Sequence, residues 1–152
     1  RGFAVEDTAA VLLRFEGGAL GTVMLSDTAA SPFCWDQTAG ETKHFPRHAA
    51  DAYRISGTEG TLELPSLTLW RYPGARGWTE RFEVQHLEAE TADPLQRQTR
   101  HFLRVIRGEE PPLVSGLDGA RTVAATLAVS RSALEGRPIR IDEMMGPGTV
   151  AA

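Results

Sequence analysis

The sequence contains a single cysteine, Cys34, no long apolar run and no excess of positive charge. One cysteine excludes an intrachain disulfide and fits a reducing compartment, so we expect a cytoplasmic location. No apolar segment approaches the roughly 20 residues that a membrane-spanning helix requires. Because nucleic-acid-binding surfaces are basic, the net charge of −4 argues against nucleic acid as a partner.

What is present is the composition of an ordinary folded domain. Hydrophobic residues make up 41% and charged residues 24% of the 152 positions, which fits one domain with a sizeable core. We expect residues 1–145 to form this domain and residues 146–152 to be a disordered tail. Because the chain begins with Arg1, in what looks like the approach to a strand, we also expect it to be a fragment of a longer protein.

The segment from Thr8 to Thr28 is predicted to form two strands around a Gly17-Gly18 turn. Apolar residues recur at every second position on both sides of this turn, and glycine supplies the positive φ that a tight hairpin needs. Apolar side chains fall on both faces, whereas a sheet with one wet face alternates apolar and polar residues. We therefore expect both faces to be covered, one by helices and the other by self-association.

Period-two patterning continues through the middle of the chain and gives way to helical spacing near its end. Strands are predicted over residues 5–15, 19–26, 52–56, 61–64, 67–72 and 79–85, with a short edge strand at 139–141. Helices are predicted from Asp93-Pro94 to a stop at Gly108, and from Leu117 or Asp118 to Glu135 with Gly136 as the stop. This pattern predicts an α+β fold, a mostly antiparallel open sheet of about six strands with helices on one face.

The connection over residues 27–50 lacks a regular pattern, and connections of this length are usually functional or mobile. It carries four candidate substrate-binding residues, Ser31, Trp35, His44 and His48. Trp35 would provide an apolar wall, and the other three would offer hydrogen bonds to a small polar ligand. The alternative is a surface loop with one packed tryptophan and solvated histidines, and the sequence does not decide between the two.

Neither group of glycines predicts a nucleotide site. Gly17, Gly18 and Gly21 lie between two strands, whereas a dinucleotide fingerprint lies between a strand and a helix. Gly116 and Gly119 stand at a helix start, where backbone N–H groups can hold an anion, but no lysine or P-loop spacing accompanies them. We therefore expect this chain to bind no nucleotide cofactor.

Metal binding and a catalytic triad are also disfavoured. Pro46 separates His44 and His48, so a helix cannot align their rings, and no paired spacing of the zinc type occurs. Ser31, His44 and Asp51 include the residue types of a triad, but no nucleophile elbow surrounds the serine. We predict no metal ligand and no catalytic residue in this chain.

Six blocks together resemble the C-terminal domain of the Gfo/Idh/MocA oxidoreductase family. They are EDTAA (6–10), EGGALGT (16–22), SDTAASP (26–32), ISGTEGTL (55–62), PLVSGLDG (112–119) and ALEGRPI (133–139). Each block is modest alone, but their order covers nearly the whole chain. The resemblance implies a fold like the C-terminal domain of glyceraldehyde-3-phosphate dehydrogenase, whose open sheet face pairs with further subunits in a dimer or tetramer.

The resemblance also implies a parent enzyme that moves a hydride between NAD or NADP and a sugar, cyclitol or related hydroxyl compound. The family's Rossmann domain, Glu-Lys-Pro motif and Asp-x-x-x-His helix have no counterpart here, so the chain alone is expected to be inactive. The alternative is a non-enzymatic module that self-associates or binds small polar ligands. An upstream reading frame encoding a strand, a glycine fingerprint and a helix would favour the enzyme.

Overall fold

The computed structural model describes residues 2–90 and 92–146 and divides the chain into two compact units. The first unit contains residues up to Thr28 together with those from Arg100 onward, and the second contains Ala29–Thr99. Of the predicted tail, residues 147–152 lie outside the described residues. No helix in the described part of the chain is long and apolar enough to cross a membrane.

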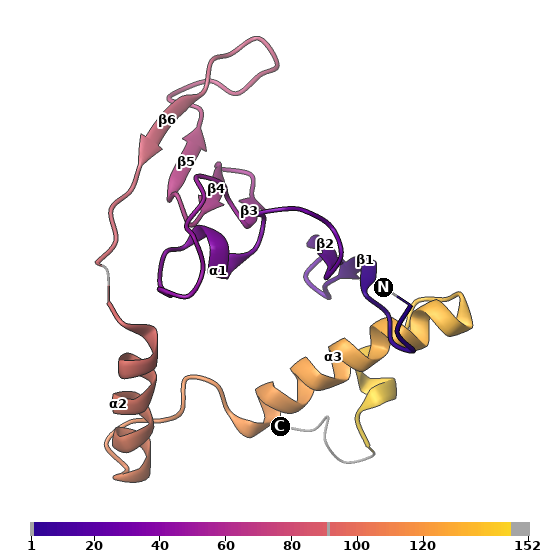
Figure 1. The fold of residues 1–152 in the computed structure, drawn as a ribbon. Coiled ribbons are helices and arrows are strands. Elements are labelled where there is room, and N and C mark those ends of the chain that lie inside the picture. Colours follow the sequence, from indigo (N-terminus) through magenta and orange to yellow (C-terminus); the bar gives the residue numbers. More distant parts are fainter. Residues whose placement is uncertain (1, 91, 147–152) are drawn as a thin grey trace. The chain divides into compact units, whose positions relative to one another are not determined.

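Within the described residues, six strands, three α-helices and one 3-10 helix follow in the order that Figure 1 shows. Their bounds are β1 (Thr8–Arg14), β2 (Leu20–Ser26), α1 (Trp35–Thr38), β3 (Tyr53–Ser56), β4 (Thr61–Leu64), β5 (Thr68–Arg71), β6 (Glu83–His86), α2 (Pro94–Ile106), α3 (Gly116–Glu135) and η1 (Ile141–Met144). The predicted α+β class with six antiparallel strands is confirmed.

In the first unit, β1 and β2 form the predicted hairpin, in register from Thr8 opposite Ser26 to Arg14 opposite Leu20. Gly18 takes a φ of 86°, which a residue with a side chain rarely adopts, and its N–H donates to the Phe15 carbonyl oxygen at 3.0 Å. The two glycines therefore make the turn that the sequence predicts.

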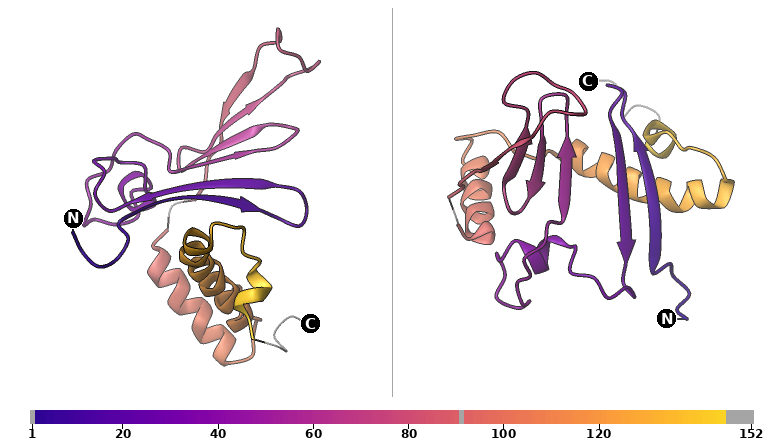
Figure 2. Two further views of the ribbon diagram at one scale, coloured as in Figure 1. Left: turned by 90° about the vertical axis from the view of Figure 1, so that its right-hand side faces the viewer. Right: turned by 90° about the horizontal axis from the view of Figure 1, so that it is seen from above.

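The two faces of this hairpin differ in exposure. In β1 the odd-numbered side chains are half-buried, and Figure 2 shows α3 passing alongside the hairpin within the same unit. On the even-numbered face, Leu12 is 73%, Leu20 70% and Met24 78% exposed. We call Leu12, Leu20 and Met24 the open face of the hairpin.

The predicted start of α2 and the predicted glycine stops after both long helices are confirmed, whereas α3 begins at Gly116, just before the predicted Leu117. The Asp93 carboxylate accepts the Gln96 N–H at 3.0 Å at the start of α2, and Gly108 follows the end of α2 with a φ of 71°. Ser115 caps α3, and Gly136 closes it in the left-handed conformation. Ala124 and Ala128 on α3 are buried, as their small size allows.

In the second unit, β3, β4, β5 and β6 form an antiparallel meander in sequence order. Between β4 and β5, Leu67 has a φ of 56°, and the Asp51 carboxylate binds the adjacent Ser66 through its N–H at 2.8 Å and its hydroxyl at 3.1 Å. The Ser66 hydroxyl is also hydrogen-bonded to the Thr68 hydroxyl, at 2.8 Å. Side-chain hydrogen bonds thus stabilise the turn that joins these two strands.

Three details of the sequence-based prediction need correction. The six strands form two sheets, not one, because alternation identifies strands but does not say which edges pair. Residues 139–141 are not a strand: the Arg140 N–H donates to the Glu143 carboxylate at 3.0 Å, which favours the short helix η1. The irregular connection also contains the single helical turn α1.

Candidate functional site

All four predicted substrate-binding residues lie in the connection that surrounds α1, in the second unit. Thr38 is buried, and its hydroxyl donates to the Cys34 carbonyl oxygen at 2.8 Å. The Arg47 guanidinium donates to the Thr38 carbonyl oxygen at 3.3 Å, and the His48 N–H donates to the Gln37 carbonyl oxygen at 2.7 Å. These bonds fold the returning chain back onto α1.

Trp35 has the most defined position of the four. Its ring is half-buried and lies 5.8 Å from the Tyr53 ring, tilted by 44°, so the loop is anchored to β3. The indole N–H donates to the Glu41 carboxylate at 2.7 Å. The indole N–H is therefore engaged within the protein, and the role of the Trp35 ring as an apolar wall stays a prediction.

The polar candidates Ser31, His44 and His48 are exposed. The Ser31 hydroxyl accepts the Phe33 N–H at 3.3 Å, and the His44 N–H donates to the Thr42 hydroxyl at 3.2 Å. Within the described residues, no hydrogen bond joins the side chains of the four candidates to one another. Their assignment to substrate binding stays a prediction.

The triad and metal interpretations gain no support. Asp51 directs its carboxylate to the backbone and hydroxyl of Ser66, at 2.8 and 3.1 Å. Among residues 2–90 and 92–146, no group of three histidine, cysteine or acidic side chains could hold a metal ion. Asp51 therefore has a structural role at the β4–β5 turn.

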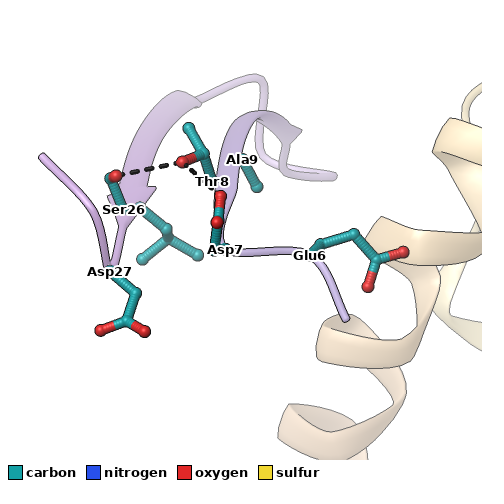
Figure 3. Close-up of a pocket in the computed structure, with 7 residues that line it drawn as sticks. Glu6, Asp7, Thr8, Ala9, Ser26 and Asp27 are labelled. Atoms are coloured by element: carbon teal, nitrogen blue, oxygen red, sulfur yellow. Dashed lines mark hydrogen bonds between the residues drawn. The ribbon is translucent and has the colours of Figure 1, made fainter. Parts of the chain in front are cut away.

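A shallow surface hollow with a mixed polar and apolar lining, which the sequence did not reveal, lies at the end of the hairpin opposite the Gly17-Gly18 turn (Figure 3). It has a volume of about 380 Å³ and is lined by Glu6, Asp7, Thr8, Ala9, Leu25, Ser26 and Asp27. The Thr8 and Ser26 hydroxyls lie 3.0 Å apart across the strands. The predicted hairpin places these two hydroxyl residues opposite each other, and this was the feature of the sequence that could have pointed to the hollow. Carboxylate and hydroxyl oxygens here can accept hydrogen bonds from a hydroxyl-bearing ligand.

The start of α3 is satisfied internally. The Ser115 hydroxyl accepts the Asp118 N–H at 3.2 Å, and the Asp118 carboxylate accepts the Ser115 N–H at 2.9 Å. Hydrogen bonds from the Ser115 side chain and backbone lower the pKa of Asp118. An anionic carboxylate at this helix start is unsuited to a phosphate, and the Gly17-Gly18 turn lies between strands. Neither glycine group fits a dinucleotide.

Comparison with known proteins agrees with the resemblance seen in the sequence. The family model described as the oxidoreductase family C-terminal alpha/beta domain matches residues 1–141. A myo-inositol 2-dehydrogenase from Thermotoga maritima is 30% identical over 146 residues, which cover 92% of this chain and 38% of that protein. No solved structure gives a significant match. This family uses NAD or NADP, and the chain corresponds to the C-terminal domain, not to the part that binds the cofactor. The chain therefore belongs to the Gfo/Idh/MocA oxidoreductase family, as its C-terminal domain.

Proposed function

We propose that this chain is the substrate-side and oligomerisation domain of a dehydrogenase. The parent enzyme would transfer a hydride between NAD or NADP and a sugar, cyclitol or related hydroxyl compound. The observation that carries the proposal is the family match over residues 1–141, together with the similarity to a protein named for myo-inositol. The chain spans only 38% of the length of that relative. We therefore propose the dehydrogenase activity for the longer parent protein and not for this chain.

The connection around α1 is the proposed substrate wall. Trp35 is held by Tyr53 and Glu41 and presents ring surface, which suits the apolar face of a cyclitol or sugar ring. The exposed side chains of Ser31, His44 and His48 would hydrogen-bond to hydroxyl groups of the substrate. In this arrangement the domain binds and orients the substrate, and the cofactor domain supplies the chemistry.

The open face of the hairpin is the proposed contact with a second copy. Leu12, Leu20 and Met24 are large apolar side chains left exposed together. Burying such a face against its own copy would remove apolar area from water, which is the main driving force of association. A dimer or tetramer in the cytoplasm is therefore part of the proposal, and the single cysteine supports that location.

The second candidate function is a non-enzymatic module that self-associates or binds small polar ligands. The exposed apolar face of the hairpin and the shallow hollow of the first unit are compatible with it. The two candidates differ in their need for a nicotinamide cofactor.

Activity of the complete gene product separates them. We expect NAD(P)-dependent oxidation of at least one member of a panel of cyclitols and sugars, with product formation followed by NADH or NADPH absorbance. In that enzyme, Trp35→Ala should raise KM for the substrate about tenfold and leave the KM for NAD(P) unchanged. Trp78→Ala, the same truncation at a fully exposed tryptophan outside this loop, is the matched control.

Binding to the chain alone provides the second measurement. NADH fluorescence should not change on titration with the 152-residue chain, and saturable NADH binding would contradict both candidates. Polyol binding to a complete protein that never reduces NAD(P) would favour the module.

A further inference from the structure

His101, in the second half of α2 and in the first unit, connects this helix to the segment that leads into α3. Its ring Nδ1 lies 2.5 Å from the Glu110 carboxylate, and its Nε2 accepts the Leu113 backbone N–H at 3.1 Å. Only 21% of the His101 side chain and 30% of the Glu110 side chain are exposed. Both nitrogens of this ring are therefore engaged within the protein.

The two contacts define one protonation state of the ring. A backbone N–H can only donate, so Nε2 must be unprotonated. The remaining proton is then on Nδ1, where it donates to Glu110. Arg104 donates to the same carboxylate oxygen at 2.8 Å, and the Arg104 and His101 contacts lower the pKa of Glu110, which keeps that acceptor ionised. Neutral His101 in its Nδ1–H form satisfies every partner.

We propose that His101 is a pH-sensitive latch, which ties residues 110–113 to α2 while its ring is neutral and releases Leu113 when Nε2 takes up a proton. Protonation converts Nε2 from an acceptor into a donor that faces another N–H. Histidine is the side chain whose charge changes most readily near neutral pH. The freed segment ends at Ser115, the cap of α3, so acid would loosen the connection between α2 and α3.

The charges around the ring act in opposite directions. Glu110 stabilises the protonated ring, whereas Arg104 and the Leu113 N–H oppose it. One turn earlier on α2, Arg97 is paired with Glu90, and Glu109 adjoins Glu110 in the segment. Acidification should therefore preserve the Glu110 contact and break the Leu113 contact selectively.

Nuclear magnetic resonance of the 152-residue chain tests the latch. At pH 8 the imidazole nitrogen shifts of His101 should report the Nδ1–H tautomer. Between pH 8 and pH 5 the protection factor of the Leu113 amide against hydrogen exchange, corrected for the intrinsic pH dependence of exchange, should fall about tenfold. The amide of Val105, inside α2, is the internal reference. An Nε2–H tautomer at pH 8, or unchanged Leu113 protection, would overturn the proposal.

Three variants sharpen this measurement. In His101→Gln the side-chain carbonyl can accept the Leu113 N–H but cannot titrate, so Leu113 protection should become independent of pH. In Glu110→Gln the protonated ring loses its anionic partner, so the release of Leu113 should move to lower pH. His86→Gln, in the second unit, should leave the Leu113 profile as in wild type. A wild-type pH profile in His101→Gln would also refute the latch, and if that variant does not fold, the wild-type tautomer still decides.

Discussion

The two sheets of this molecule are stabilised in different ways. The β1–β2 hairpin has two seven-residue strands, and its open face is apolar and exposed. The β3–β6 meander has four-residue strands, and charged pairs link their side chains. Arg54 and Trp70 both donate to Glu63, at 2.6 and 2.9 Å, and Arg71 pairs with Glu83 at 3.2 Å. The Trp70 and Arg54 contacts lower the pKa of Glu63.

This difference bears on the proposed association through the hairpin. The meander also leaves apolar side chains exposed, among them Tyr53 and Ile55 on β3, but charged and polar side chains paired across its strands accompany them. Large apolar side chains on a two-stranded ribbon have no such compensation, and an isolated hairpin is marginally stable at best. Under the proposed association, we expect the hairpin to be the part of the molecule whose stability depends on the second copy.

Leu12→Lys should have the largest effect. If the open face is buried between two copies, an unpaired ammonium there should weaken association by on the order of 100-fold. Sedimentation velocity at micromolar concentration would show the wild type as a dimer or larger and the variant as a monomer. Leu134→Lys, at a position 87% exposed on α3, is the matched control and should not change the assembly. A monomeric wild type would contradict the proposal that the open face of the hairpin is buried against a second copy.

Gly60→Ala tests the close packing of the meander and should have the next largest effect. A Cβ at Gly60 would lie 2.5 Å from the Trp70 carbonyl oxygen, a backbone atom that cannot move without disturbing β5. We expect a loss of about 2 kcal/mol in the free energy of unfolding, measured in urea.

Gly57→Ala is the control in the same turn. The nearest atom to a Cβ at Gly57 is 3.8 Å away, an ordinary contact, so its unfolding free energy should stay within about 0.5 kcal/mol of wild type. Equal stability of the two variants would show that β4 and β5 are less closely packed than described.

The smallest expected effect concerns η1 in the first unit. Arg137 and the Arg140 N–H bind the Glu143 carboxylate, and these contacts lower its pKa to about 2. A lowered pKa means that the contact stabilises the fold fully above pH 4.5 and that this contribution is lost as the pH falls toward 2.

Thermal unfolding between pH 6 and pH 2 measures this contribution. Glu143→Gln should lower Tm slightly at pH 6, and the difference from wild type should shrink toward pH 2. Glu88→Gln, at an exposed carboxylate in the second unit, controls for the general loss of a negative charge. A Tm difference that stays constant over this range would exclude the electrostatic origin.

Local signals in the sequence predicted most of the elements. Asp93-Pro94 and Gly136 mark helix ends because their effects act within a few residues, and the Gly17-Gly18 turn follows from φ alone. The strand pattern likewise depends on neighbouring positions. These features could be read without knowing how distant segments meet.

Features that depend on distant contacts could not be predicted. Trp35 was identified, but its partner Tyr53 was not, because the intervening connection has no regular pattern. The bonds of His101 to Glu110 and Leu113 depend on how the segment after α2 turns back. The division of the strands into two sheets could not be predicted either, because it depends on which strand edges meet in the folded chain.

Cys34 precedes α1, is exposed and is the only thiol in the sequence. A maleimide fluorophore would therefore attach at one place, next to the tryptophan proposed as the substrate wall. Quenching of the dye by that indole would then report loop movement as polyols are added. The chain thus contains a natural attachment point for an optical sensor of its own candidate ligand.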